Sequence, residues 1–129
     1  MKTPENLNYQ KTDEWVAVDG SIATIGISDY AQDQLSDIVF IEFNYSVGDE
    51  LKKGDTLATI ESVKAAGDVM SPVSGKVIEV NNSLEDKPET LNEDPFGLGW
   101  MCKIEMNDPS ELGSLMKAKD YTQYCDERD

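Results

Sequence analysis

The residue with the clearest chemical potential is a lysine between two predicted strands. Lys64 follows a β-rich stretch at residues 56–60 and precedes a second strand that starts near residue 69. By position alone, a lysine on a turn is usually a solvated surface charge. Here Glu61 precedes the lysine and the small residues Ala65 and Ala66 follow it. A modifying enzyme could reach the ε-amine of such a lysine on a rigid hairpin without entering a deep pocket. The segment therefore indicates a site of covalent modification.

No other set of side chains predicts catalysis. The 129 residues contain no histidine, which excludes a Ser-His-Asp or Cys-His nucleophile system and every zinc site that relies on imidazole. Cys102 and Cys125 lie far apart in the sequence and form no Cys-x-x-Cys motif, so we expect two inert thiols in a reducing compartment. Asp and Glu pairs are frequent, but none stands out from the composition. We therefore expect neither a catalytic centre nor a metal site.

The charge balance excludes two classes of partner. With 26 acidic and 11 basic residues, the formal net charge is −15, which argues against nucleic acid and against anionic membrane surfaces. An acidic surface keeps a protein soluble and can steer it toward basic patches on partner proteins. We find no apolar run long enough to span a membrane and no N-terminal signal pattern. The sequence predicts a cytoplasmic protein, and we expect a monomer.

Short strands and turns predict the elements that present Lys64. Residues 15–18 and 22–25 read as a hairpin around Asp19-Gly20, because this dipeptide suits the positive φ angles of a tight turn. A helix is predicted from Asp29 to Leu35, with Ser28 as its N-cap. Further strands are predicted at residues 38–43, 56–60, 76–80 and 100–106. This spacing favours a small antiparallel sandwich or barrel.

The remaining segments complete a single domain over residues 1–129. Residues 81–99 are polar and rich in turn formers, and the core is expected to span roughly residues 15–106. Asp108-Pro109 predicts the start of a helix, because proline suits the first helical position. A second helix is predicted at residues 121–127, so that residues 108–127 form a C-terminal helical segment. The fold class is mostly β with peripheral helices.

Several stretches together resemble the H protein family of the glycine cleavage system. The resemblance covers residues 15–106 in particular. It rests on residues 13–16, 25–32, 37–40, 61–66 (Glu-Ser-Val-Lys-Ala-Ala), 71–75 (Ser-Pro-Val-Ser-Gly) and 92–100. Each match is weak alone, and their shared order makes the resemblance specific. It implies the barrel-sandwich hybrid fold of lipoyl and biotinyl carriers.

The resemblance implies a carrier, not an enzyme. In this family the lysine that matches Lys64 is joined to lipoic acid, whose dithiolane carries the aminomethyl group of glycine. The implied partners are glycine decarboxylase, aminomethyltransferase, dihydrolipoamide dehydrogenase and a lipoate-attaching enzyme. The cofactor supplies the difficult chemistry, while the protein supplies placement and recognition. Tethering gives the arm a high effective concentration in each active site.

The resemblance implies roles for four further residues. Lipoyl carriers share an acidic residue three positions before the lysine and a glycine further upstream, which fall on Glu61 and Gly48, and both are expected to guide the attaching enzyme. The ordinary readings are a solvated carboxylate at Glu61 and a turn at Gly48. Members of the family shelter the loaded arm in a surface cleft, and Glu14 and Asp68 match positions near it only loosely.

Other readings of the lysine remain open. An H-like protein can donate lipoate to other complexes or serve another lipoyl-dependent pathway. A biotinyl carrier is disfavoured because biotin carriers set methionine on both sides of the lysine, where Val63 and Ala65 stand here. A last alternative is an unmodified interaction domain that only kept the fold. The intact lysine motif argues against it.

The sequence departs from the family pattern at three positions. Asp13 stands where histidine usually precedes Glu-Trp, Ser36 replaces a common glycine, and Gly67 replaces a usual serine. None of them is the lysine. The loss of the histidine puts contacts at the cleft or with a partner in doubt.

Overall fold

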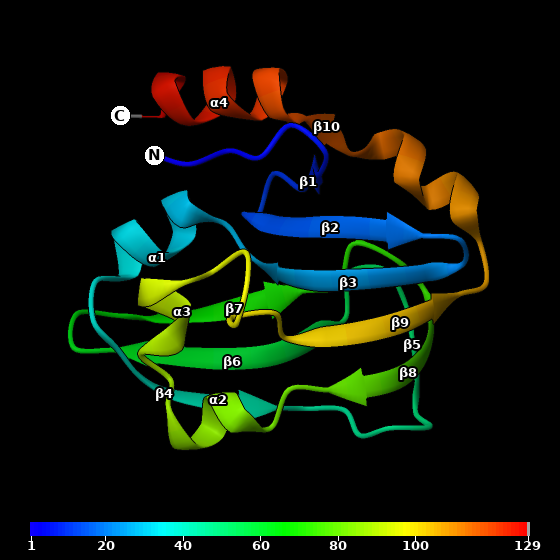
Figure 1. The fold of residues 1–129 in the computed structure, drawn as a ribbon, viewed down its shortest axis with the longest axis horizontal. Coiled ribbons are helices and arrows are strands. Elements are labelled where there is room, and N and C mark those ends of the chain that lie inside the picture. The colour runs from blue at the N-terminus through cyan, green and yellow to red at the C-terminus, as the bar shows by residue number, and fades with distance from the viewer. Residues whose placement is uncertain (129) are drawn as a thin grey trace.

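Two antiparallel sheets form the body of the molecule (Figure 1). The structure is a computed structural model and describes residues 1–128. One sheet has seven strands in the order β10-β1-β2-β3-β9-β8-β5, and the other has three in the order β4-β6-β7. The strands are β1 (Asn8–Tyr9), β2 (Glu14–Asp19), β3 (Ile22–Ile27), β4 (Ile38–Phe43), β5 (Glu50–Leu51), β6 (Thr56–Ser62), β7 (Ala66–Met70), β8 (Gly75–Val80), β9 (Cys102–Met106) and β10 (Met116–Lys117). The mostly β fold with peripheral helices is confirmed.

Helices cover the edges and ends of the sheets (Figure 1). They are α1 (Asp29–Leu35), α2 (Ser83–Asp86), α3 (Thr90–Glu93), the 3₁₀ helix η1 (Pro109–Ser114) and α4 (Ala118–Glu127). The prediction for α1 is confirmed with its cap, because the Ser28 hydroxyl accepts a hydrogen bond of 3.1 Å from the Ala31 N–H. Four-residue helices show no periodicity, so α2 and α3 were not predicted; each is anchored by one buried leucine, Leu84 and Leu91 respectively.

The first hairpin forms as predicted, but its turn is shifted by one residue. Asp19 pairs with Ile22, so Gly20 and Ser21 are the two turn residues. Gly20 supplies the positive φ of +63°, while Asp19 stays in the strand. The Asp-Gly dipeptide therefore marked the hairpin correctly and placed its turn one residue early.

The first and the last strand of the chain form the same edge of the larger sheet. β1 pairs with β2 on one side and with β10 on the other. The rings of Tyr9 and Tyr121 stack with centroids 4.6 Å apart, and both are buried. Around them lies a second apolar cluster that includes Trp15 and Cys125, distinct from the main core between the sheets. The N-terminal segment and α4 are thereby fixed to β2.

The C-terminal elements differ in detail from the prediction. The closing strand begins at Cys102 instead of residue 100, and α4 begins at Ala118 instead of residue 121. The helix predicted from Asp108-Pro109 is the 3₁₀ helix η1, with Asp108 accepting a hydrogen bond from the Ser110 N–H at its N-cap. Within residues 1–128, no helix is long and apolar enough to cross a membrane.

Candidate modification site and the adjoining cleft

Lys64 lies at the exposed tip of the hairpin that joins β6 to β7. The Ser62 N–H donates to the Ala65 carbonyl over 2.8 Å and closes the turn. The Ser62 hydroxyl accepts hydrogen bonds from the N–H groups of Lys64 (3.2 Å) and Ala65 (3.0 Å). Val63 N–H donates to the Asp37 carbonyl at 3.0 Å and ties the tip to the start of β4. The backbone is thus held in place, while the lysine side chain is presented to solvent.

Glu61 lies at the end of β6, three residues before Lys64. It pairs with Phe40 of β4 on one side and with Ala66 of β7 on the other. Directly paired residues point to the same face of a sheet, so these three exposed side chains form a row on the outer face next to the tip. The carboxylate of Glu61 is therefore open to any enzyme that approaches Lys64.

Gly48 is not brought to the lysine. It lies in the connection between β4 and β5, at the opposite end of the molecule from the β6–β7 turn in Figure 1. Its φ is +98°, and its N–H donates to the Val77 carbonyl at 2.8 Å. A positive φ is the conformation that glycine adopts most readily. The turn alone accounts for glycine at this position.

A cleft of about 330 Å³ opens beside the hairpin. Ile60 and Gly67, a register pair in the two hairpin strands, form one wall, and Leu35 of α1 lies on another. Glu14 and Asp68, matched only loosely from the sequence, both contribute to the lining of this cleft. The Asp68 side chain, however, lies on the outer face of the sheet, where its carboxylate accepts a hydrogen bond of 3.5 Å from the Thr59 hydroxyl. Because Ile60 and Gly67 are the pair that follows Glu61 and Ala66, the cleft begins next to the tip that carries Lys64.

Glu14 is buried in the cleft wall, with 1% of its surface exposed. Its carboxylate accepts hydrogen bonds from Gln10 Nε2 (2.7 Å), the Thr12 hydroxyl and the Met70 N–H (3.0 Å). Burial raises the pKa of Glu14 to about 7, although these hydrogen bonds act in the opposite direction. A carboxyl that changes charge near neutrality therefore faces the cleft. The sequence offered only a loose match here, because burial depends on the packing of β2 against β7.

The far rim of the cleft is formed by Asp13 and Arg128. The guanidinium donates two hydrogen bonds to the Asp13 carboxylate, of 2.6 and 2.9 Å. Asp13 also accepts a hydrogen bond of 2.7 Å from the Tyr121 hydroxyl. The aspartate at the usual histidine position is therefore paired with the C-terminal end of α4. Sequence inspection missed Arg128, because these partners are 115 residues apart.

Comparison with known proteins places this arrangement in one family. The family model described as "Glycine cleavage H-protein" matches residues 7–128. The chain belongs to the glycine cleavage H-protein family. A glycine cleavage system H protein of Coprothermobacter proteolyticus is 52% identical over 128 residues, covering 98% of this chain and all of that protein. That of Anaeromyxobacter sp. strain K is 46% identical over the full length of both.

A solved H protein has the same fold. The crystal structure of a glycine cleavage system H protein from Mycobacterium marinum superposes with a TM-score of 0.84 at 29% sequence identity, covering 93% of this chain and 96% of that one. Membership in the glycine cleavage H-protein family confirms the family and function predicted from the sequence, a lipoyl carrier shuttle in glycine cleavage. The chain is thus a carrier component that works with the enzymes of that system.

Ser62 was also missed in the sequence. Serine hydroxyls often bond the backbone one to three residues away in turns, and that signal could have singled it out next to Lys64. Across residues 1–128, no group of three or more His, Cys, Asp or Glu side chains is arranged to hold a metal ion. The candidate functional features of this H-protein chain are the Lys64 hairpin and the cleft beside it.

Proposed function

We propose that Lys64 is the lipoyl attachment residue, and that the chain carries the aminomethyl group of glycine on this arm without catalysing a step itself. The observation that carries the proposal is the position of Lys64, on an exposed tip fixed by Ser62 and beside the cleft. An exposed ε-amine on a fixed backbone is accessible to an attaching enzyme. The same position allows the finished arm to fold back along β7.

The residues of the cleft suit such an arm. Apolar side chains on its walls, including Leu35, Ile60 and Val69, match an alkyl chain and a dithiolane. The carboxyl group of Glu14 suits an aminomethyl group, which is cationic when protonated. We expect the apolar walls to limit the access of water and the Glu14 carboxyl group to orient the amine. We therefore propose that the loaded arm rests here between visits to partners.

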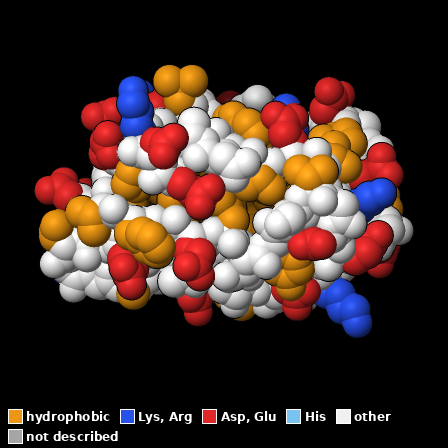
Figure 2. Space-filling model, turned by 90° about the horizontal axis from the view of Figure 1, so that it is seen from below, with side chains coloured by type: hydrophobic (Ala, Val, Ile, Leu, Met, Phe, Trp, Pro, Cys, Tyr) orange, Lys and Arg blue, Asp and Glu red, His pale blue; other side chains and the backbone are white. Residues whose placement is uncertain are grey.

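The attached lipoyl group would supply the redox and group-carrying chemistry, and the chain's own residues tether, place and release the cargo. The proposed partners are glycine decarboxylase, aminomethyltransferase, dihydrolipoamide dehydrogenase and a lipoate-attaching enzyme. Acidic side chains are spread over the face seen in Figure 2, where lysine and arginine are few. Together with the net charge of −15, this distribution favours partners with basic docking surfaces.

Recognition by the attaching enzyme is proposed to involve Glu61 and, indirectly, Gly48. Glu61 supports this role through its exposure in the row next to Lys64. Gly48 lies elsewhere, so its contribution is restricted to holding the β4–β5 connection in shape. The cytoplasmic location and the monomeric state expected from the sequence stay predictions.

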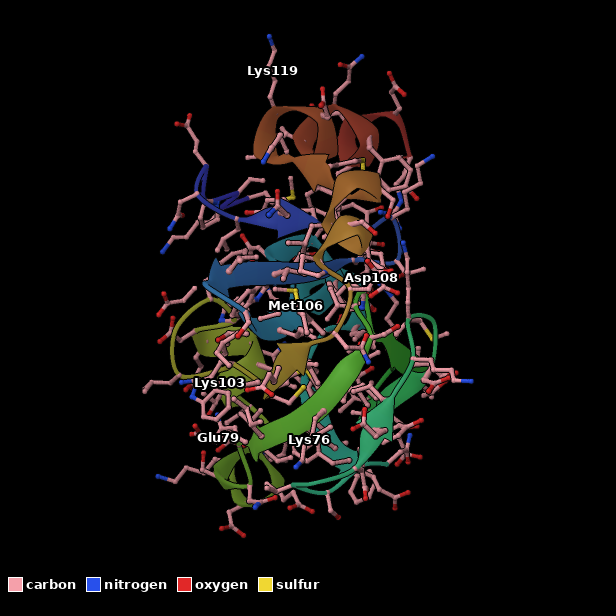
Figure 3. All side chains as sticks on the ribbon, turned by 90° about the vertical axis from the view of Figure 1, so that its right-hand side faces the viewer. Lys76, Glu79, Lys103, Met106, Asp108 and Lys119 are labelled. Carbon is pink, nitrogen blue, oxygen red and sulfur yellow. The ribbon has the colours of Figure 1, made fainter. Side chains whose placement is uncertain are left out.

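Intact mass spectrometry tests the attachment. Co-expression with a lipoate-attaching enzyme should raise the mass of the wild-type chain by one lipoyl group. Lys64→Arg should keep the charge and lose the added mass. Lys76→Arg is the matched control, because Lys76 is exposed on β8 (Figure 3), and it should be modified like the wild type. A wild-type chain that stays unmodified contradicts the proposal.

Reconstitution separates the shuttle from the alternative of a lipoate donor. The lipoylated chain, glycine decarboxylase, glycine and labelled bicarbonate should exchange the carboxyl carbon of glycine. A lipoylated chain that supports no exchange favours a role in lipoate relay or another lipoyl-dependent pathway.

A further inference from the structure

The ion pair between Asp13 and Arg128 closes the rim of the cleft at the point where the two ends of the chain meet. Arg128 is the sole arginine of the sequence. Its side chain is 29% exposed and that of Asp13 is 14% exposed. A bidentate arginine–carboxylate pair with this degree of burial is more strongly coupled than a fully solvated pair. The contact is therefore more than an incidental surface salt bridge.

Asp13 is fixed on the other side by its own backbone. Its φ is +78°, which is uncommon for any residue other than glycine and most readily accepted by Asn and Asp. The Asp13 N–H donates to the Gln10 carbonyl, and the Asp13 carbonyl accepts from the Ser28 N–H, both at 2.9 Å. The carboxylate is thus aimed at α4 by a loop that is held at both of its backbone groups.

Arg128 is held from both sides as well. Its guanidinium carbon lies 4.3 Å from the ring centroid of Tyr30 in α1 and 4.6 Å from that of Tyr124 in α4. Stacking on aromatic rings fixes the plane of the guanidinium in addition to the two hydrogen bonds. The Tyr121 hydroxyl donates to Asp13 and also contacts the Ser28 hydroxyl at 2.6 Å. The end of α4, the start of α1 and the loop before β2 are joined in one network.

The pair also decides the charge of the cleft. Four charged residues contribute to its lining, namely Asp13, Glu14, Asp68 and Arg128, and of these Asp68 has its side chain on the outer face of the sheet. Because Arg128 neutralises Asp13, the negative charge that can face a cargo in the cleft is left to Glu14, at the start of β2. An unpaired Arg128 would repel a cationic cargo, and an unpaired Asp13 would attract it to the rim.

We infer that Asp13 and Arg128 are positioning residues, a latch that holds the C-terminal end of α4 at the rim of the cleft and thereby retains the aminomethyl cargo. The inference rests on the proposed function. Loss of the cargo in water is a hydrolysis: water adds to the methylene carbon, the carbon–sulfur and carbon–nitrogen bonds break, and thiol, formaldehyde and ammonia are formed. A closed rim slows this reaction by limiting the access of water.

Cargo retention tests the latch in the lipoylated, loaded chain without aminomethyltransferase. Formaldehyde release should be about three- to tenfold faster in Arg128→Gln and in Asp13→Asn, since a pair of this kind contributes on the order of 1 kcal/mol. The double variant should release formaldehyde no faster than the faster of the two single variants, because each substitution already removes the contact with the partner. Arg128→Lys should restore part of the retention through its charge.

A second readout needs no cargo. Hydrogen exchange of the amides at residues 121–128 should be faster in unmodified Arg128→Gln than in the unmodified wild type. Lys119→Gln is the control for both measurements, because Lys119 lies at the other end of α4, projects away from the body of the molecule and lines a different cavity (Figure 3). It should behave as the wild type.

The outcomes separate this inference from the proposed function. If Arg128→Gln releases formaldehyde and exchanges amide hydrogens at the wild-type rates, the latch is overturned while the carrier function stands. An equal acceleration by Lys119→Gln also overturns it, because the effect would then follow net charge alone. A wild-type chain that accepts no lipoyl group overturns the proposed function, and the inference with it.

Discussion

The buried carboxylate of Glu14 accepts a hydrogen bond of 3.0 Å from the backbone N–H of Met70, and so connects β2 of the larger sheet to the end of β7 in the smaller one. Gln10 strengthens this connection, because its side-chain amide donates both to Glu14 and to the Met70 carbonyl. The link spans 56 residues of sequence. It lies in the wall of the cleft, so the packing of the two sheets and the chemistry of the cleft depend on the same carboxyl group.

The stability of the fold should decrease as pH rises through neutrality because of Glu14. Burial raises the pKa of Glu14 to about 7 from an ordinary value of 4.5. Between these values the folded chain binds more protons than the unfolded one, so stability is fully present below the unfolded pKa and is lost as pH rises through the folded one. The loss attributable to Glu14 should be about 2 to 3 kcal/mol between about pH 5 and pH 8.

Urea unfolding over this pH range measures the effect, with Glu14→Gln as the comparison. The glutamine cannot ionise, so the difference in unfolding free energy between the two chains should shift with pH in favour of the variant. Parallel pH profiles for the two chains would show that Glu14 ionises normally.

Removing the Ser62 hydroxyl should slow lipoyl attachment without unfolding the chain. Ser62→Ala loses the two bonds from the N–H groups of Lys64 and Ala65, and the looser tip should reduce kcat/KM of the attaching enzyme about two- to fivefold, the equivalent of roughly one hydrogen bond. Ser62→Thr keeps the hydroxyl and is the control. Equal rates for the alanine and threonine variants would show that the hydroxyl does not prepare the tip.

Reversing the charge at Glu61 should impair lipoyl attachment more strongly than reversing the charge at Glu42, which is further from Lys64. Glu42 pairs with Thr59, which pairs with Asp68, so Glu42 lies on the same outer face but further from the tip. Glu61→Lys should slow lipoyl attachment at least about tenfold, because we expect the attaching enzyme to bind this carboxylate. Glu42→Lys should change the rate little. Initial rates at saturating lipoate measure both, and similar losses would indicate a general charge effect.

Gly75→Ala should destabilise the fold where β8 pairs with β9. A Cβ at this position would lie 2.1 Å from the carbonyl oxygen of Glu105, which is far inside contact distance and requires the strands to separate. We expect a loss of about 2 to 4 kcal/mol in the free energy of unfolding. Gly113→Ala has open space around the added methyl group and should remain within about 0.5 kcal/mol of the wild type in thermal or urea unfolding.

The sequence by itself determined the features that depend on neighbours along the chain. Alternating β-branched residues and glycine turns predicted most strands, and Ser28 predicted the start of α1, because capping and turn geometry act over a few residues. The same local information singled out Lys64 between two strands with Glu61 and two alanines beside it. The family resemblance then named its modification.

Tertiary structure decided what those local signals do together. The two-residue strands β1 and β10 exist because Asn8 pairs with Lys117, and no local pattern marks such a pair. The burial of Glu14, the pairing of Asp13 with Arg128 and the separation of Gly48 from Lys64 likewise follow from the way distant segments pack. Burial, dielectric environment and ion pairing are properties of contacts in space, so local sequence patterns did not predict which residues line the cleft.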